Sequence, residues 1–358
     1  MTQIMTMVSQ VSDEMLKTIQ DNPDKVYFPG FSDKGITVDR VMFTVPGTNF
    51  EIYWYGFLIA LGILLAMIYG FRKFKPVGID ADRATDAIIG GLVGAILGAR
   101  TYYILFNSEI SFKEFFNIRN GGLAIYGGII GALLVGGIIA KLRKLRVSAI
   151  LDVAAPGFFI GQAIGRWGNF FNQEAFGSNT DLPWGMMSNS TIEYLSNNGG
   201  DGITAYAPVH PCFLYESIWC VIGFILLNAY FKHRKFDGEI FLMYTGWYGL
   251  GRFFIEGLRT DSLYIGSIRV SQLLAGICFV ASVILIIVFR KKVKQSGNYK
   301  FYYETKESIE TLAASEEKTL KKAIEKAKAK GKDCSELDNK YAEKFGNKHV
   351  DNNDKEEN

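Results

Sequence analysis

The chain has 358 residues, of which 49% are hydrophobic and 21% charged, and its formal net charge is only +3. This average conceals an apolar body from about residue 50 to residue 289 and a charged tail beyond it, so length alone does not set the number of domains. The four cysteines lie far apart without a C-x-x-C motif, so we expect neither a disulfide framework nor a metal site. We also expect no nucleic-acid partner.

Seven apolar segments are long enough, at about 20 residues each, to cross a bilayer as helices. The segment 149–165 is short and contains Asp152 and Pro156, and the segment 239–257 carries Arg252 and Glu256. We therefore predict an all-α fold, a polytopic membrane helical bundle with seven transmembrane helices. The segments lie near residues 52–70, 87–106, 122–140, 149–165, 212–231, 239–257 and 270–289.

Lys and Arg collect in alternate connections between these segments. The connections after the first, third and fifth spans are basic, whereas the long connection 170–210 has no Lys or Arg. Because basic loops stay in the cytoplasm, we expect the N-terminus and the 170–210 connection to lie outside and the C-terminus inside. The first 49 residues lack the basic and apolar stretches of a cleavable signal peptide, so insertion is expected to begin with the first span.

This topology predicts an extracytoplasmic segment over residues 1–50, a seven-span membrane domain over 51–290 and a charged cytoplasmic tail over 291–358. The outer loop 172–208 is too long for a passive connector, so we expect it to form a small head. The tail has a helical pattern at Lys318–Lys330, which we expect to be solvated or partly disordered. Attraction of this helix to anionic inner-leaflet lipid is the alternative.

Residues 111–118, SFKEFFNI, combine three phenylalanines with a lysine and a glutamate. This pattern suits a short helix that lies at the outer membrane interface. A plain exposed loop is the alternative.

Glycines recur every four residues at Gly90, Gly94 and Gly98, and they crowd the third span from Gly127 to Gly137. Such spacing is typical of helices that pack closely in a membrane. A nucleotide-binding glycine loop would need a soluble βαβ unit around it, and the pattern indicates none. We therefore predict close helix packing.

The sixth span carries polar residues at steps of four, four and three, namely Tyr248, Arg252, Glu256 and Arg259. At roughly 100° per residue, the four side chains lie on one face of a helix. An ionisable group at membrane depth costs roughly 2.5 to 3.5 kcal/mol. A buried Arg–Glu pair that locks the bundle is one explanation. Two arginines to one glutamate leave a positive excess, however, and this excess favours an anionic ligand.

The segment GQAIGRWGNFFNQEAFG places Arg166 at the outer end of the fourth span, with Asn169, Asn172 and Glu174 shortly after it. A guanidinium group offers a planar fork that matches phosphate oxygens. An arginine that only snorkels to the interface would not need such partners. Arg100 in the second span is either a third cation facing the same cavity or such a snorkelling residue.

His210 opens the fifth span just after the outer loop, and Glu216 follows it. An imidazole and a carboxylate are therefore expected at the same membrane level as Arg166 and Arg259. A lone histidine is often a structural hydrogen-bonding group, and a catalytic base is the other interpretation.

Together these segments resemble the prolipoprotein diacylglyceryl transferases, bacterial plasma-membrane enzymes that lipidate the cysteine of lipoprotein precursors. GRWGNFFNQEAFG at Gly165–Gly177 is similar to the signature of that family. The match covers about residues 51–289, in the same order and spacing. Supporting matches are WYG at Trp54–Gly56, GGLAIYGGIIG at Gly121–Gly131, HPCFLYE at His210–Glu216 and YGLGRFFIEGLRTD at Tyr248–Asp261.

The resemblance implies transfer of the diacylglyceryl group from phosphatidylglycerol to the thiol of the lipobox cysteine. This reaction forms a thioether, releases glycerol phosphate and needs no cofactor. Negative charge collects on the departing phosphate, so paired guanidinium groups would stabilise the transition state more than the ground state. Arg166 and Arg252 match the essential arginines of the family, and we expect them to bind the phosphate.

The other expected site residues follow from the same motifs. Asn169 and Glu174 are expected to orient the headgroup and Arg166, and Glu256 with Arg259 to form the opposing side of the pocket. The resemblance also implies a multi-pass protein of the bacterial inner membrane whose active site faces the outer leaflet. The expected phosphatidylglycerol site is completed by Gly177, Tyr248, Tyr55 and Arg100.

The chain departs from the pattern of some relatives in two places. Tyr126 stands in the third-span motif, where part of the family has a histidine proposed as a base. The base is therefore Tyr126, His210 or a carboxylate, or none is required, because nearby cations lower the thiol pKa from its usual value of about 8.5. In HPCFLYE, Cys212 and Phe213 replace a small hydroxyl residue and a glutamine, and Cys212 is expected only to pack.

A lipid or anion transporter is the main competing hypothesis, because buried arginines on discontinuous spans also mark substrate pathways. It predicts pseudo-symmetric repeats, but the two halves have no self-similarity. A receptor-like bundle would not need so many charges, and an intramembrane protease would need a Ser–His or Asp–Asp arrangement that does not stand out here. We therefore predict the transferase, with phosphatidylglycerol, the prolipoprotein and the lipid bilayer as partners.

Overall fold

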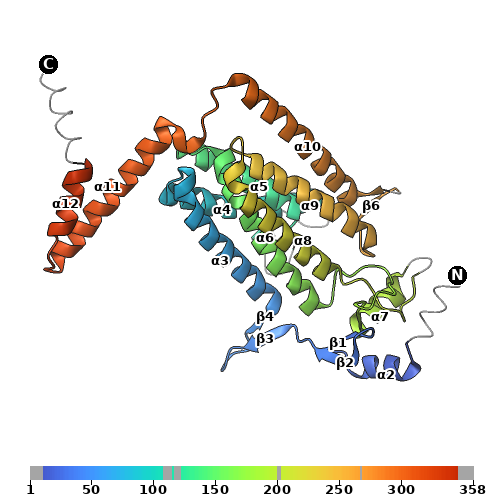
Figure 1. Ribbon diagram of the computed structural model, residues 1–358. Helices are drawn as coiled ribbons and strands as arrows, with labels where there is room; N and C mark the ends of the chain where they lie inside the picture. The colour runs from blue at the N-terminus through green and yellow to red at the C-terminus, as the bar shows by residue number, and fades with distance from the viewer. Residues whose placement is uncertain (1–10, 108–114, 117–121, 200–202, 267, 346–358) are drawn as a thin grey trace, which may run out of the picture. The chain divides into compact units, whose positions relative to one another are not determined.

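The computed structural model describes residues 11–107, 115–116, 122–199, 203–266 and 268–345, which are mostly helical (Figure 1). The chain divides into two compact units, Met1–Gly70 with Leu151–Asn298 and Phe71–Ile150 with Tyr299–Asn358. The interfacial helix or loop expected at residues 111–118 lies largely outside the described residues.

The first unit combines short elements with long helices. The long helices are most of α3 (Trp54–Phe74), α6 (Val147–Asn172), α8 (Cys212–Tyr230), α9 (Glu239–Leu258) and α10 (Val270–Ser296). The short elements are α2 (Asp13–Asp21), β1 (Lys25–Phe28), β2 (Ser32–Thr37), β3 (Val41–Thr44), β4 (Glu51–Tyr53), β5 (Met187–Ser188), α7 (Asn189–Asn198), β6 (Tyr264–Ile265) and β7 (Ile268–Arg269).

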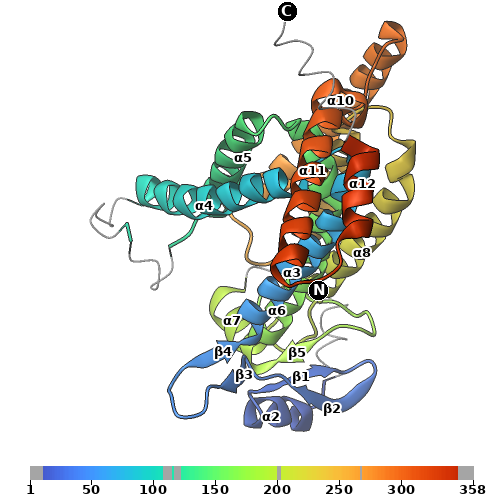
Figure 2. The same cartoon turned by 90° about the vertical axis from the view of Figure 1, so that its left-hand side faces the viewer.

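The N-terminal segment and the 172–208 loop together form a small subdomain, which we call the head. Strand β1 pairs with β2 on one side and with β5 on the other, both antiparallel, and Val26 lies opposite Ser188. An apolar cluster joins Val26 to Leu195 of α7 and to Phe170 near the end of α6. Figure 2 shows α2, β1, β2 and β5 gathered together. The N-terminal segment, expected as a region of its own over residues 1–50, thus shares a sheet with the loop through β1.

Helices α8 and α9 pack through a reciprocal pair of tryptophans. The rings of Trp219 and Trp247 stack with centroids 4.2 Å apart, and each indole N–H donates to the backbone carbonyl of the other residue at 2.9 Å. Gly251 leaves room for this pair, since a Cβ there would lie 2.2 Å from Trp219 Nε1. The pairing fixes the rotation of α9 about its axis relative to α8. Helix α10 packs along the other side of α9 (Figure 1).

Buried charges fix the beginning of α9. Asp152 of α6 has no exposed surface and accepts hydrogen bonds from the backbone N–H groups of Gly238 and Phe241, at 2.8 and 3.0 Å. Glu239 is equally buried and pairs with Arg290 of α10 at 2.5 Å. The first N–H groups of a helix have no partner within the helix, and the helix dipole favours negative charge there. Capping of α9 therefore accounts for the aspartate in the fourth span.

The second unit contains α4 (Ala81–Phe106), α5 (Ile125–Leu142) and the tail helices α11 (Lys306–Ala329) and α12 (Ser335–Phe345). A Cβ at Gly94 would lie 2.4 Å from the carbonyl oxygen of Gly131, and a Cβ at Gly98 would lie 2.3 Å from that of Gly127. Two backbones approach this closely only where side chains are absent. The close packing predicted from the glycine spacing is confirmed.

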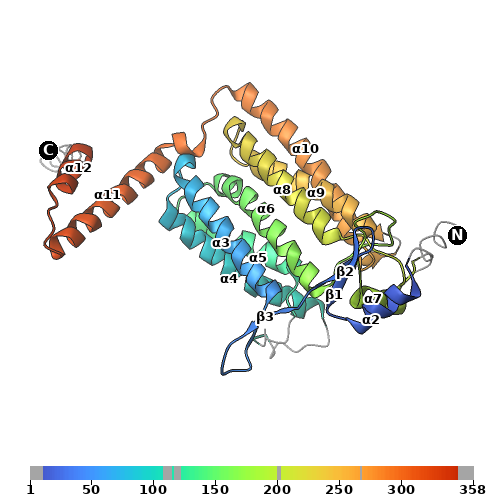
Figure 3. The same cartoon turned by 60° about the horizontal axis from the view of Figure 1, so that its bottom comes forward.

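The tail is a helical hairpin whose beginning packs against loops of the second unit (Figure 3). Tyr302 is buried and donates from its hydroxyl to the carbonyl of Lys144 at 2.9 Å. Ser308 donates to the carbonyl of Gly78 at 2.6 Å. The helix predicted over Lys318–Lys330 falls mainly within α11. The contacts of Tyr302 and Ser308 hold the beginning of the tail, before this predicted stretch.

The long helices carry apolar side chains on their surface and bury their charges. Ile129, Ile130, Leu133 and Leu134 on α5 are each more than half exposed. Six described helices are long and apolar enough to cross a membrane: α3, α4, α5, α6, α8 and α10. The sixth predicted span, residues 239–257, forms the expected helix, α9, but it carries Glu239, Arg252 and Glu256 and is not among these six helices.

Alanine substitutions on α5 test the glycine packing. Gly131→Ala would place a methyl group 2.0 Å from the carbonyl oxygen of Gly94, whereas a methyl group at Gly137 would meet nothing within 4 Å. Overpacking costs about 1–3 kcal/mol, while alanine favours an open helical position over glycine by about 0.5–1 kcal/mol. We expect Gly131→Ala to lower the Tm of the purified protein in detergent and Gly137→Ala to keep or raise it. Equal Tm values for the two variants would contradict the packing.

Candidate active site

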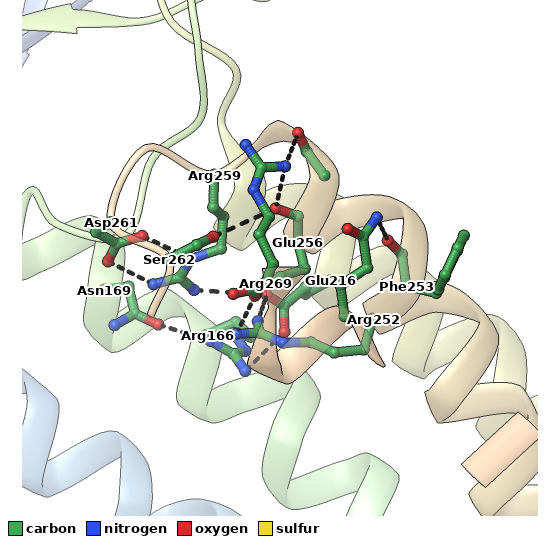
Figure 4. A network of polar contacts seen from close by, with 12 residues as sticks. Arg166, Asn169, Glu216, Arg252, Phe253, Glu256, Arg259, Asp261, Ser262 and Arg269 are labelled. Carbon is green, nitrogen blue, oxygen red and sulfur yellow. Dashed lines mark hydrogen bonds and ion pairs between the residues drawn. The ribbon is translucent and has the colours of Figure 1, made fainter. Parts of the chain in front are cut away.

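Glu216 of α8 lies at the centre of a buried group of charges (Figure 4). Its carboxylate lies 2.6 Å from Arg166 Nη2, 2.7 Å from Arg252 Nη1 and 3.9 Å from Arg259 Nη1. One carboxylate therefore joins α6, α9 and the residue after α9. Because Glu216 is only 4% exposed, water screens these attractions little. We call Arg166, Glu216, Arg252, Glu256 and Arg259 the charged centre.

The polar face predicted on the sixth span is present on α9. Arg252 pairs with Glu256 at 2.5 Å, and Arg259 binds Asp261 through two hydrogen bonds of 2.8 and 2.6 Å. Together with Glu216 of α8, this gives three carboxylates for three guanidinium groups, so the positive excess expected from α9 alone is balanced. Each guanidinium has five N–H donors, and the carboxylates engage only some of them. The arginines are thus oriented by carboxylates and retain donors for an anion.

Short backbone pairings join the ends of α6, α8 and α9. The N–H of Gly177 donates to the carbonyl of His210 at 2.9 Å, and the N–H of Ser178 donates to the carbonyl of Leu258 at 2.7 Å. A Cβ at Gly177 would lie 2.8 Å from the Cβ of His210 and 3.0 Å from the carbonyl oxygen of Leu258. The glycine is therefore required by close packing, and its predicted contact with substrate stays a prediction.

The turn after α6 brings Glu174 back toward Arg166. Gln173 has a φ of 53°, a left-handed conformation that is uncommon outside glycine and is often found at functional sites. Glu174 Oε1 accepts hydrogen bonds from the amides of Asn169 and Asn172 at 3.0 and 3.1 Å. Asn169 Oδ1 in turn lies 3.5 Å from Arg166 Nη1. The structure thus brings together Asn169, Glu174 and Arg166, as the sequence predicted.

His210 lies close to two aromatic residues. Its Nδ1 lies 3.1 Å from the hydroxyl of Tyr215, and this hydroxyl accepts a hydrogen bond of 2.7 Å from the indole of Trp184. Burial lowers the pKa of His210 below its ordinary value, against the opposing effect of Asp181. The imidazole is therefore mainly neutral at pH 7. A neutral imidazole suits both interpretations of this residue, a structural partner and a base.

Two predicted tyrosines belong to the same unit as the charged centre. Tyr248 lies one turn before Arg252 on α9 and stacks on Tyr244, with ring centroids 6.1 Å apart. Tyr55 of α3 packs on Gly168 of α6, where a Cβ would lie 2.4 Å from the tyrosine ring. Their contacts with a lipid stay predictions.

Arg100 and Tyr126 belong to the second unit. Arg100 is 3% exposed and donates to the backbone carbonyls of Phe115 and Gly122, at 3.0 Å each. It is therefore not a snorkelling arginine, because its guanidinium group is buried and binds the chain between α4 and α5. Tyr126 lies exposed near the start of α5. The roles of Arg100 and Tyr126 in the reaction stay predictions.

Glu216 is the residue that sequence reasoning missed as a site residue. Its position in HPCFLYE, at the level of Arg166 and Arg259, was the available signal. Its partner Arg252 lies 36 residues away in the chain, and no helical periodicity relates residues on different helices. Among the described residues, no group of three or more His, Cys, Asp or Glu side chains could hold a metal ion.

The fold and the site define a class of protein: a multi-pass helical membrane protein with an arginine–glutamate centre where several helices meet. The sequence model of the family described as prolipoprotein diacylglyceryl transferase matches residues 40–288. The chain belongs to this family, and it is a transferase.

Similar proteins include three named phosphatidylglycerol–prolipoprotein diacylglyceryl transferase. The protein from Finegoldia magna is 44% identical over 263 residues, which cover 72% of this chain and 99% of the relative. The protein from Clostridioides difficile is 40% identical over 72% of this chain and 98% of its own length. The protein from Bacillus cereus is 42% identical over 70% of this chain and 92% of its own length.

Neutralising Glu216 tests its place in the charged centre. Glu216→Gln would leave Arg166 and Arg252 without their shared counter-ion, and breaking a buried ion pair costs about 3–5 kcal/mol. We expect the Tm of the purified protein in detergent, followed by tryptophan fluorescence, to fall by several degrees. Glu14→Gln, which alters an exposed glutamate of α2, is the matched control and should leave the Tm unchanged. If Glu216→Gln were as stable as the control, the centre would not depend on this carboxylate.

Proposed function

We propose that the charged centre is the site at which this chain transfers the diacylglyceryl group of phosphatidylglycerol to the cysteine thiol of a prolipoprotein. The family supports the transferase activity, and the names of the relatives supply the donor lipid and the acceptor protein. One observation carries the choice of site. Arg166 and Arg252, from different helices, contact the two oxygens of one buried carboxylate. Their guanidinium groups are thereby held close enough to bind a single phosphate group.

In the proposed reaction, the thiolate sulfur of the lipobox cysteine attacks the glycerol carbon that bears the phosphate ester. A C–S bond forms as the C–O bond breaks, and the electron pair leaves with the oxygen of glycerol phosphate. Negative charge grows on this leaving group. Guanidinium groups already oriented by Glu216 stabilise that charge more in the transition state than in the ground state.

The other residues are proposed to surround this pair of arginines. Asn169 and Glu174 orient Arg166 and the lipid headgroup, a role supported by their hydrogen bond of 3.0 Å. Glu256 and Arg259 form the opposite wall. Tyr248, Tyr55 and Gly177 complete the phosphatidylglycerol site.

The thiol must lose its proton, and several routes fit the residues present. His210 supports a base because a neutral imidazole accepts a proton. Tyr126 as the base rests on the family resemblance alone. Arg100 is proposed only as a further cation of the phosphatidylglycerol site, as its position in the second span suggests. A carboxylate is a further candidate, and a thiol lowered in pKa by the arginines needs no dedicated base. The pH–rate profiles of Tyr126→Phe and His210→Gln distinguish these routes, since removal of the base abolishes one limb of the profile.

We also propose a location and an orientation, namely the bacterial plasma membrane with the N-terminus outside and the C-terminus in the cytoplasm. The alternation of basic loops supports this orientation. Helix α9 is then the sixth of seven spans: its 20 residues match the length of a span, and Glu216 and Arg290 compensate its charges. Residues 1–50 and the 172–208 loop lie outside, 51–290 form the membrane domain with its active site toward the outer leaflet, and 291–358 form the cytoplasmic tail.

A reconstituted assay tests the transferase and its proposed phosphate-binding arginines. Purified protein in vesicles that contain phosphatidylglycerol is mixed with a lipobox-cysteine peptide, and the mass of the peptide is followed. The wild type should add a diacylglyceryl group. Arg252→Ala should slow the transfer by about 100-fold or more. This is the usual effect of removing one preorganised hydrogen-bond donor that stabilises a developing negative charge. Arg252→Lys keeps the charge without the planar fork and should be intermediate.

Arg143→Ala is the control for this assay, because Arg143 is an exposed residue of the second unit that pairs with Asp86 at 2.8 Å. It should retain the wild-type rate. A folded Arg252→Ala variant with the wild-type rate would refute the arginine assignment. A folded wild type that adds no diacylglyceryl mass would refute the function.

Cys334 permits a test of the orientation. Cys212 and Cys220 are buried, whereas Cys334 in the tail and Cys278 on α10 are partly exposed, so Cys278→Ser is included in every labelled variant. Ser196 is exposed on α7 of the head. In spheroplasts, a membrane-impermeant maleimide should label Ser196→Cys directly but label Cys334 only after permeabilisation. The opposite labelling pattern would invert the proposed topology.

A further inference from the structure

A cavity of about 550 Å³ lies beside the charged centre, and of its lining residues the reaction proposed above uses only Glu174. Its walls come from the turn after α6, from α7 of the head, from the residues after α9 and from Arg40. All these parts belong to the first unit. Its volume is within the range of ordinary ligand-binding pockets.

Two carboxylates of this cavity are linked directly to the charged centre. Asp261 binds Arg259 through two hydrogen bonds, and Arg259 in turn lies 3.9 Å from Glu216 (Figure 4). Glu174 accepts a hydrogen bond from Asn169, which contacts Arg166. A molecule bound in the cavity would therefore lie only one or two side chains away from the proposed phosphate-binding arginines.

The cavity also contains an acceptor without a donor. Gln173 lines it and is only 8% exposed, and among the described residues its Oε1 has no hydrogen-bond partner. A buried polar atom is normally paired, because burial without a partner forfeits its hydrogen bonds with water. The same residue is held in the left-handed backbone conformation, which also costs free energy. The Oε1 atom itself is covered in this conformation, so it becomes available to a ligand in the cavity only when the Gln173 side chain turns toward the cavity.

The charges of the walls indicate which kind of ligand fits. Asp261 is already paired with Arg259, but Glu174 and Glu193 still oppose one guanidinium group, that of Arg40, which donates to the carbonyl of Asn172 at 3.0 Å. This excess of negative charge disfavours a phosphate group. Walls rich in oxygen acceptors favour a ligand with many N–H donors, and a polypeptide backbone offers one at every residue other than proline.

We infer that this cavity binds the polypeptide that follows the acceptor cysteine in the prolipoprotein, and that the Gln173 side chain turns toward it so that Oε1 accepts a hydrogen bond from its backbone. The inference rests on the proposed function, since only that reaction supplies such a polypeptide. When the cysteine thiol is at the arginines, the residues after it extend toward the aqueous side. Helix α7 of the head lines the cavity along this path, and Asn197 on this helix faces the bound acceptor polypeptide.

The test uses the full-length protein in vesicles that contain phosphatidylglycerol, and two acceptor peptides. The long peptide continues for six residues beyond the lipobox cysteine, and the short peptide ends at the cysteine as an amide. The variants are Gln173→Met, which removes the acceptor at similar side-chain length, and Asn197→Ala. Ser196→Ala is the matched control, because Ser196 is the neighbouring exposed residue of α7 and does not line the cavity.

We expect the wild type to prefer the long peptide in kcat/KM. Each cavity variant should raise the KM for the long peptide about three- to tenfold, the effect of one lost hydrogen bond, and change its kcat little. The preference for the long peptide should therefore shrink, whereas Ser196→Ala should keep it. Asn197→Ala provides the test if the left-handed backbone of residue 173 does not accept methionine.

Other outcomes would overturn the inference in distinguishable ways. A rise in the KM for phosphatidylglycerol alone would assign the cavity to the lipid headgroup. A wild type that uses both peptides equally well would show that the cavity does not contact the polypeptide, while the proposed function would stand. A folded wild type that modifies neither peptide would overturn the proposed function and this inference together.

Discussion

One buried carboxylate, that of Glu216, is shared by arginines from separate parts of the chain, and the arrangement of the site depends on it. Like charges repel, so Arg166 and Arg252 would separate in a medium of low dielectric constant without a common counter-ion. With the carboxylate between them, at 2.6 and 2.7 Å, the two guanidinium groups lie close together before any substrate arrives. Their orientation is part of the folded structure, so the reaction need not supply the free energy of bringing them together.

The rest of the first unit keeps this arrangement in place. Reciprocal tryptophan contacts set α8 against α9, and backbone hydrogen bonds from Gly177 and Ser178 tie the turn after α6 to the neighbouring helix ends. The apolar exterior of the helices suits lipid, while the charges lie within. Polar and apolar surfaces are thus distributed opposite to those of a water-soluble protein, as the absence of water within the bilayer requires. The proposed peptide cavity uses the head, which is composed largely of polar loops and short elements.

Local patterns in the sequence were sufficient to predict the helices and the contents of their faces. The four-residue glycine spacing predicted close helix packing, which the structure places between α4 and α5, and the steps between Tyr248 and Arg259 predicted the polar face of α9. Contacts between distant segments could not be predicted in this way. Strand β5 has only two residues, too few for a periodic signal, so its pairing with β1 was not foreseen. Glu216 likewise has its partners on other helices, and the balance of charge was misjudged because only the residues of α9 were counted.

The capping of α9 by Asp152 has a mechanical consequence. A helix that is restrained only by apolar contacts can turn or slide in a bilayer, because one lipid-facing surface replaces another at little cost. Helix α9 is held at its first turn by a carboxylate from α6 and at its last turn by the backbone of Ser178. Rotation or sliding at either end would break hydrogen bonds that no solvent replaces. Helix α9 is therefore fixed at both ends. A displacement of Asp152 would tilt or rotate the whole helix and so change where the Arg252 side chain points.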